Sequence, residues 1–242
     1  MRKLVVFILN KISRIIFHII PDEFKSLKPG KKLLLKLEDN FIDETFIHFL
    51  EHYKKSLLFV DPIKIREYAI QTSLLNDKNK EYYYLEFGVA GGHSANFFSK
   101  YVNKFYCFDS FEGLREDWGG TLGAAKGTYT QNKKIPKLHS NIEPVVGWIE
   151  DTLDDFLKKN NPKINFVHFD IDTYSSTKFA LEKIKPYLNK NAILIFDELT
   201  GYVGWENGEY KALKEVFKDE EFKYLAFSMR DIGYNKGVIQ IK

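Results

Sequence analysis

The chain contains very little sulfur. Its 242 residues include one cysteine, Cys107, and two methionines. A single cysteine cannot form a disulfide within the chain, which excludes a disulfide-stabilised secreted scaffold, and the absence of paired cysteines or histidines argues against zinc. Cys107 lies in the apolar run 105–108, so we expect it to be a small buried core residue. The cysteine usage gives no indication of an oxidising compartment.

The sequence also lacks a hydrophobic run long enough to span a membrane near its start. The apolar run 4–9 is too short for that, and no small-residue cleavage site of a secretory signal follows it. There is no internal repeat or low-complexity tract, and the contents of 44% hydrophobic and 16% aromatic residues are those of a folded chain. We therefore expect a folded cytoplasmic protein.

The positive charge is concentrated at the N-terminus. Residues 1–36 contain nine Lys or Arg and two acids, although the net charge of the whole chain is only +3. Within residues 1–20, Lys11, Arg14 and His18 recur at helical spacing, which predicts an amphipathic helix lying on an anionic membrane surface. Such a helix would hold the protein on the inner face of the membrane. The alternative, docking on the protein itself or on a second subunit of a homo-oligomer, stays open. No motif for nucleic-acid binding accompanies these charges.

Residues 21–80 have a helical pattern. The pair Asp61-Pro62 is typical of an N-cap and first turn, and it predicts a helix over 62–75. The polar stretch 76–80 then marks the boundary of a helical N-terminal portion. We expect a domain over residues 81–242.

After residue 80, short apolar runs alternate with amphipathic helices. This order predicts an α/β fold with a Rossmann-like, doubly wound and mostly parallel sheet. The segments 222–228 and 236–241 are joined by too few residues for a helical crossover, so they should form a C-terminal antiparallel hairpin. The expected strands are 82–87, 104–108, 142–146, 164–169 and 191–196, and the expected helices are 93–101, 152–160, 174–187 and 208–219.

The first strand leads into a glycine-rich loop. Residues 82–94 run from an apolar strand through Gly88, Gly91 and Gly92 to the start of a helix, where Ser94 is expected to supply a hydrogen bond. Closely spaced glycines let the backbone approach a ligand, and such loops bind nucleotide-type cofactors. Asp109 ends the next strand and is placed to accept hydrogen bonds from ribose hydroxyls.

Acidic residues follow several of the predicted strands. The carboxyl ends of parallel strands lie at one edge of the sheet, where ligands bind, so these acids should converge there. Clustered carboxylates without cysteine indicate Mg²⁺ or a similar hard divalent cation. His168 is interpreted as a hydrogen-bonded core residue rather than a metal ligand. The acids are Glu86, Asp109, Asp170, Asp172, Asp197 and Glu198.

Two glycine-rich loops contain aromatic residues. The first, residues 110–135, includes Phe111, Trp118 and Tyr129, and the second, residues 200–208, includes Tyr202 and Trp205. Their length and composition are typical of lids. The sequence leaves open whether these rings stack on a ligand or pack the loops onto the body of the protein.

Five motifs follow one another along the chain: Leu85–Ser94, Phe108–Leu114, Gly147–Leu153, His168–Tyr174 and Phe196–Leu199. Together they resemble the macrocin O-methyltransferase-like family of class I S-adenosylmethionine-dependent methyltransferases. The resemblance covers residues 82–242. It implies that Glu86 and Gly88 hold the methionine end of S-adenosylmethionine, that Asp109 with Ser110 holds the ribose, and that Trp148 and Ile149 border the adenine.

The resemblance also implies a divalent cation bound by Asp170, Asp197 and Glu198, with Asp172 as general base. The family pair is usually Asp-Asp, whereas Glu198 is the second member here. A cation that acidifies a hydroxyl and a carboxylate that accepts its proton suit methyl transfer to a sugar or glycan precursor. The alternatives are an NAD-dependent oxidoreductase, whose Gly-x-Gly-x-x-Gly loop this chain lacks, and a non-catalytic membrane-associated binding protein.

Overall fold

The computed structural model describes residues 31–119, 124–229 and 234–242. The chain divides into two units, residues 1–43 and 44–242. The amphipathic helix expected over residues 1–20 lies outside the described residues. No helix in the described ranges combines the length and the apolar character that crossing a membrane requires.

Two helices and a short strand precede the glycine loop. Helix α3 (Lys31–Tyr53) ends shortly before strand β1 (Leu57–Phe59), and helix α4 (Pro62–Leu74) follows. The predicted start of α4 is confirmed, because the Asp61 carboxylate accepts a hydrogen bond from the Ile63 N–H at 2.8 Å. The sequence did not predict β1, because a half-exposed strand of three residues gives no alternating pattern.

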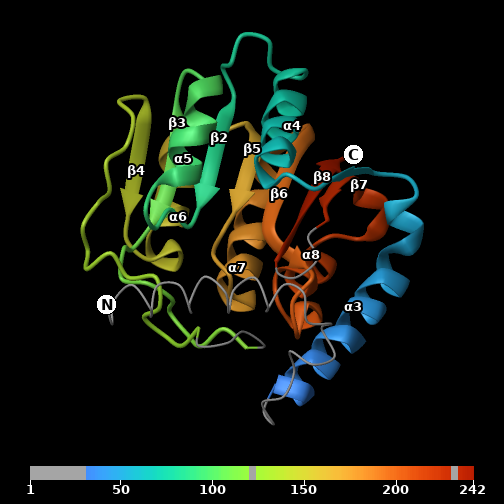
Figure 1. Ribbon diagram of the computed structural model, residues 1–242. Helices are drawn as coiled ribbons and strands as arrows, with labels where there is room; N and C mark the ends of the chain where they lie inside the picture. The colour runs from blue at the N-terminus through green and yellow to red at the C-terminus, as the bar shows by residue number, and fades with distance from the viewer. Residues whose placement is uncertain (1–30, 120–123, 230–233) are drawn as a thin grey trace, which may run out of the picture. The chain divides into compact units, whose positions relative to one another are not determined.

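The sheet has eight strands in the order β1-β7-β8-β6-β5-β2-β3-β4 (Figure 1). Strands β4, β3, β2, β5 and β6 are mutually parallel, as predicted. The bounds of the remaining strands are β2 (Tyr83–Phe87), β3 (Phe105–Asp109), β4 (Ile142–Val146), β5 (Ile164–Phe169), β6 (Leu188–Thr200), β7 (Phe222–Ser228) and β8 (Asn235–Ile241).

The C-terminal hairpin is confirmed, since β8 pairs antiparallel with both β7 and β6. Strand β6 is longer than the predicted 191–196 and continues through Thr200, where it pairs again with β8 at Asn235 after an irregularity. Asp197 and Glu198 therefore lie within a strand rather than after it. Strand alternation then turns these two neighbouring side chains toward opposite faces of the sheet.

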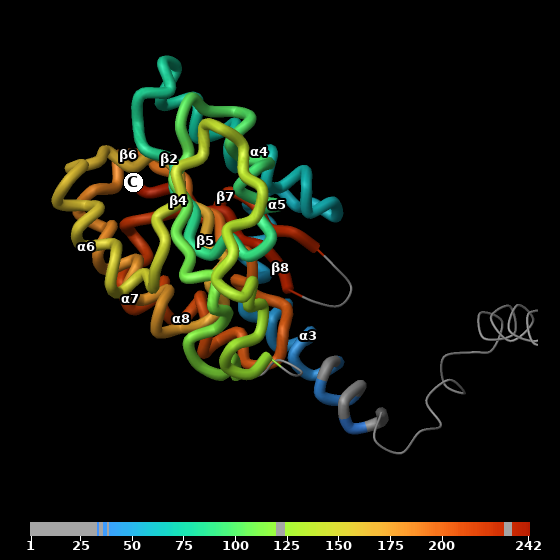
Figure 2. Tube along the Cα trace, turned by 90° about the vertical axis from the view of Figure 1, so that its left-hand side faces the viewer, coloured from blue at the N-terminus to red at the C-terminus, as the bar shows by residue number. Residues whose placement is uncertain are grey.

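Helices cover both faces of the sheet (Figure 2). Helix α4 and α5 (His93–Phe98) lie on one face, and α6 (Ile149–Asn160), α7 (Tyr174–Ile184) and α8 (Glu209–Val216) lie on the other. The predicted helices 93–101 and 174–187 end in short 3₁₀ turns, Ser99–Tyr101 and Lys185–Tyr187. Cys107 is buried on the face of α4 and α5, where burial raises the pKa of its thiol. This confirms its predicted role as a core residue.

Candidate active site

The glycine loop begins where three strands come close together. The Gly88 N–H donates to the Phe108 carbonyl at 2.9 Å, and the Asp170 N–H donates to the Phe87 carbonyl at 2.8 Å. Gly88 has φ +85°, and a Cβ at this position would overlap the carbonyl oxygen of Asp170. Only glycine tolerates both this positive φ and this close approach of the Asp170 carbonyl. The loop therefore brings the ends of β2, β3 and β5 to one point.

Asp109 holds this loop in place. One oxygen of its carboxylate accepts hydrogen bonds from the N–H groups of Val89 at 2.7 Å and Ala90 at 2.8 Å. The other oxygen accepts from the Phe111 N–H at 2.7 Å. A carboxylate offers about four acceptor positions, so Asp109 retains capacity for a ligand hydroxyl. Its structural role was not expected from the sequence.

A cavity of about 260 Å³ opens beside the glycine loop. The cavity is lined by both halves of the site predicted from the sequence. One half is the glycine loop with Asp109, and the other is a group of acids. The predicted site residues that line it are Gly88, Asp109, Ser110, Trp148, Ile149, Asp170, Asp172 and Glu198.

Four predicted site residues do not line this cavity: Glu86, Gly91, Ser94 and Asp197. The expectation that Ser94 caps the following helix is wrong. Helix α5 begins after Gly92, which has φ +76° and is the N-cap, and no side chain caps this end. A glycine cap in the left-handed conformation leaves no side-chain oxygen at that point. The ligand contacts predicted for Glu86, Gly91 and Ser94 stay predictions.

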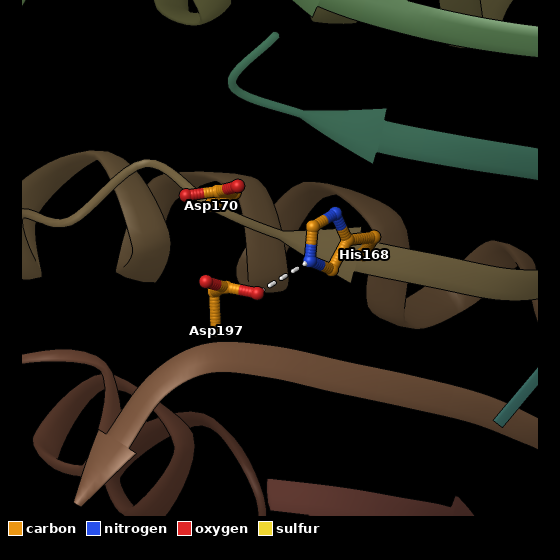
Figure 3. Close-up of side chains that lie close together, drawn as sticks. All are labelled: His168, Asp170 and Asp197. Carbon is orange, nitrogen blue, oxygen red and sulfur yellow. Dashed lines mark hydrogen bonds and ion pairs between the residues drawn. The ribbon is translucent and has the colours of Figure 1, made fainter. Parts of the chain in front are cut away.

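Glu86 instead belongs to a buried network with His168 and Asp197. The imidazole of His168 bonds Glu86 at 2.7 Å through Nδ1. Its Nε2 bonds Asp197 at 3.1 Å, and Asp170 lies beside this pair (Figure 3). Burial lowers the pKa of His168, but the bonds to the two carboxylates outweigh it and raise the pKa overall. Since carboxylates only accept, His168 donates from both nitrogens and is charged. This agrees with its interpretation as a hydrogen-bonded core residue.

Two further cations neutralise Asp197. Arg66, from α4, bonds one carboxylate oxygen at 2.7 Å, and Lys236, from β8, bonds the other at 2.6 Å. Burial alone would raise the pKa of Asp197, but the His168 hydrogen bond and the positive charges of Lys236, His168 and Arg66 hold it well below its usual range. Both oxygens are thus engaged by protein cations. Ligand atoms of His168, Asp170 and Asp197 nevertheless lie within 4.8 Å of one another, so the expected role of Asp197 as a cation ligand stays a prediction.

Asp170, Asp172 and Glu198 form a second cluster, which faces the cavity. Carboxylate oxygens of all three lie within 4.8 Å of one another. Burial raises the pKa of each, and the charge of Asp197 adds to the effect, bringing the pKa of Asp172 to about 7. Glu198 Oε2 is buried and has no hydrogen-bond partner among the described residues. A divalent cation would satisfy this oxygen and relieve the mutual repulsion of the acids.

Glu209 lies next to this cluster and was not among the site residues predicted from the sequence. It is fully buried at the start of α8, and one of its oxygens accepts the Glu198 N–H at 3.2 Å. Burial raises its pKa well above the usual range, with the charge of Asp172 adding to this effect. Since Glu209 follows a loop rather than a strand, the strand-end rule did not select it.

Comparison with known proteins identifies a domain in this chain. A family model described as a methyltransferase domain matches residues 85–199, from β2 into β6. The match favours a methyltransferase over the nicotinamide-dependent oxidoreductase considered above. All site residues predicted from the sequence lie inside the methyltransferase domain match, whereas Arg66, Glu209 and Lys236 lie outside it. No curated protein matches the chain in sequence.

Solved structures with the same fold include two methyltransferases. CalS11, a calicheamicin methyltransferase, is 20% identical with a TM-score of 0.60, covering 88% of this chain and 93% of that one. The apo structure of CalS11, described as a TDP-rhamnose 3′-O-methyltransferase, is 18% identical with a TM-score of 0.53 and coverage of 88% and 95%. The O-methyltransferase NovP is 17% identical with a TM-score of 0.53 and coverage of 74% and 80%. At these identities the likeness establishes the fold of the methyltransferase domain.

Proposed function

We propose that this protein is an S-adenosylmethionine-dependent O-methyltransferase of the macrocin O-methyltransferase-like type, acting on a hydroxyl of a sugar or glycan precursor. The observation that carries the proposal is the single cavity in which the glycine loop and Asp109 meet the acids Asp170, Asp172 and Glu198. The domain match supports methyl transfer, and the activities named for CalS11 and NovP support an oxygen acceptor.

The cofactor would bind in the half of the cavity nearest the glycine loop. The backbone of Gly88 to Ala90 would contact its methionine end, and Asp109 with Ser110 would accept hydrogen bonds from the ribose. Trp148 and Ile149 would border the adenine. Arg115 covers the Trp148 ring at 5.5 Å and pairs with Glu150 at 2.6 Å, which holds this arginine against the ring.

Asp170 and Glu198 would hold the divalent cation. Two carboxylates are a common protein contribution to a Mg²⁺ site, with water and substrate completing the coordination. When bound, such a cation lowers the pKa of a nearby acceptor hydroxyl. We assign Asp197 a different role: it anchors the end of β6 between Arg66 and Lys236, and so fixes the position of its neighbour Glu198.

Asp172 would accept the proton of the acceptor hydroxyl. Its pKa of about 7 suits a general base near neutral pH. Asp172 also has φ +62°, a strained conformation for a residue other than glycine. The bound cofactor would supply the methyl group and its sulfur would keep the electron pair of the broken carbon–sulfur bond, while Asp172 would take the proton that the acceptor oxygen loses.

Calorimetry tests the cofactor assignment. We expect S-adenosylmethionine and S-adenosylhomocysteine to bind in the micromolar range, about −7 to −8 kcal/mol, and NAD not to bind. Asp109→Asn should weaken binding of both cofactor forms at least tenfold, because it loses acceptor capacity toward both the loop and the ribose. Asp151→Asn, an exposed acid outside the cavity, is the matched control. Binding of NAD in place of both methionine cofactors would disprove the proposal.

Divalent cations should bind to the acid cluster and stabilise the protein. At about 100 times its dissociation constant, Mn²⁺ or Mg²⁺ should raise the unfolding free energy by about 2.7 kcal/mol, and EDTA should abolish both the stabilisation and methyl transfer. Glu198→Gln should weaken the binding of Mn²⁺ by about an order of magnitude, because it removes one of the two proposed carboxylate ligands. If Glu198→Gln responded to Mn²⁺ as the wild type does, the cation would have to bind elsewhere.

A further inference from the structure

Four of the five aromatic rings in the two glycine-rich loops are buried. Phe111, Trp118, Tyr202 and Trp205 are each less than 9% exposed, so they pack the loops onto the body of the protein. Tyr129 differs, because it is 52% exposed and lines the cavity. Of the two readings left open by the sequence, packing holds for the four buried rings, and Tyr129 remains for contact with a ligand.

Tyr129 lines the cavity together with residues of both halves of the predicted site. It lines the same cavity as the glycine loop on one side and as Asp172 and Glu198 on the other. Burial raises the pKa of Tyr129, and the charges of Asp172, Tyr234, Glu198 and Asp170 add to this effect. No hydrogen-bond partner for this hydroxyl is found within the described part of the chain.

The backbone around Tyr129 is fixed in an unfavourable conformation. Its φ is +68°, a region that bulky side chains rarely adopt. Backbone hydrogen bonds hold the loop on both sides: the Leu114 N–H donates to the Thr128 carbonyl at 2.9 Å, and the Gln131 N–H donates to the Phe111 carbonyl at 3.1 Å. Strain of this kind persists where the surroundings enforce it, and it is common at ligand sites.

We propose that Tyr129 contacts the methyl-bearing sulfur of the cofactor and favours its charged sulfonium form over the neutral thioether product. This inference rests on the proposed function, because that function requires the transferable methyl to lie between the glycine loop and Asp172. Tyr129 lines the same cavity as the glycine loop and Asp172, and its side chain is exposed there. Its phenolic oxygen offers lone pairs to the polarised methyl group, and its ring attracts a cation.

Calorimetry with two ligands that differ in this charge tests the inference without any knowledge of the acceptor. S-adenosylmethionine and S-adenosylhomocysteine are titrated into wild type, Tyr129→Phe and Tyr129→Ala at constant Mg²⁺. Tyr187→Phe, which removes a hydroxyl far from the cavity lining, is the matched control. Tyr129→Phe should weaken S-adenosylmethionine about two- to fivefold, the size of one weak polar contact, and leave S-adenosylhomocysteine unchanged.

Tyr129→Ala should lower the affinity for S-adenosylmethionine relative to that for S-adenosylhomocysteine further, because it also removes the ring. Equal weakening of both ligands would overturn the inference and make Tyr129 a general wall of the cavity, and unchanged affinities would remove it from the cofactor site. In both cases the proposed function would stand. If the wild type bound neither ligand, the proposed function itself would fail, so the two failures are distinguishable.

Discussion

Replacing Asp172 by Asn is expected to lower kcat by about 10²–10⁴-fold, the usual contribution of a general base. The amide keeps the shape of the side chain but cannot accept the proton of the acceptor hydroxyl. Cofactor affinity should change little, since the glycine loop and Asp109 are untouched. The measurement is single-turnover methyl transfer, with cofactor and cation saturating, across a range of pH.

The pH profile separates this role from a structural one. The pKa of Asp172 is raised to about 7 in the folded protein, so below that pH the base holds a proton and the rate should fall as pH decreases. Asp172→Asn should lack this ascending limb. A bound cation would move the limb of the wild type to lower pH. A mutant rate within a few-fold of wild type, with the limb retained, would assign the base to another group, and loss of Mn²⁺ binding would make Asp172 a ligand.

Replacing Asp197 by Asn is expected to cost about 3–5 kcal/mol of unfolding free energy, because it removes the carboxylate that pairs with Arg66 and Lys236 and leaves His168 only its bond to Glu86. For a chain of this size, that corresponds to a fall in Tm of roughly 6–20 °C. The stabilising effect of Asp197 is present above the unfolded-state pKa of an aspartate and is lost as the pH falls through its depressed folded-state pKa. Thermal unfolding at neutral and acidic pH measures both effects.

The adjacent Glu198 provides a matched comparison. Its side chain is buried like that of Asp197, but it lies among like charges instead of cations. Without divalent cations at neutral pH, Glu198→Gln should leave the Tm unchanged or raise it. Burial and the neighbouring acids penalise the ionised carboxylate of Glu198, and the neutral amide removes that penalty. If both substitutions lowered the Tm by similar amounts, the assignment of Asp197 as a neutralised anchor would be wrong.

Side-chain alternation explains why Asp197 and Glu198 have such different surroundings. The strand register pairs Glu86 with His168, and His168 with Ile195, two residues before Asp197. Glu86, His168 and Asp197 therefore share the face covered by α4, from which Arg66 reaches in. Glu198 faces the opposite side, toward Glu209 of α8. The sequence prediction ended this strand at residue 196, so the opposite orientations of Asp197 and Glu198 emerged only from the longer strand in the structure.

By itself the sequence determined the order of elements, the parallel sheet with its antiparallel hairpin, and the position of most cavity residues. These features follow from local signals, namely apolar periodicity, turn residues and the rule that ligands bind at the carboxyl ends of parallel strands. Gly88, Asp109, Asp170 and Asp172 lie at or beside strand ends, so their neighbourhood follows from the order of the strands alone.

Only the tertiary structure decided which acids are neutralised and which rings are free. Arg66 is 131 residues from Asp197 along the chain, and no local pattern specifies that this arginine, rather than another cation, reaches the carboxylate. The same holds for Tyr129, since whether a loop ring is buried depends on how the loop packs. Burial and partner charges set both the pKa of a group and its freedom to bind a ligand, and both arise from contacts distant in sequence.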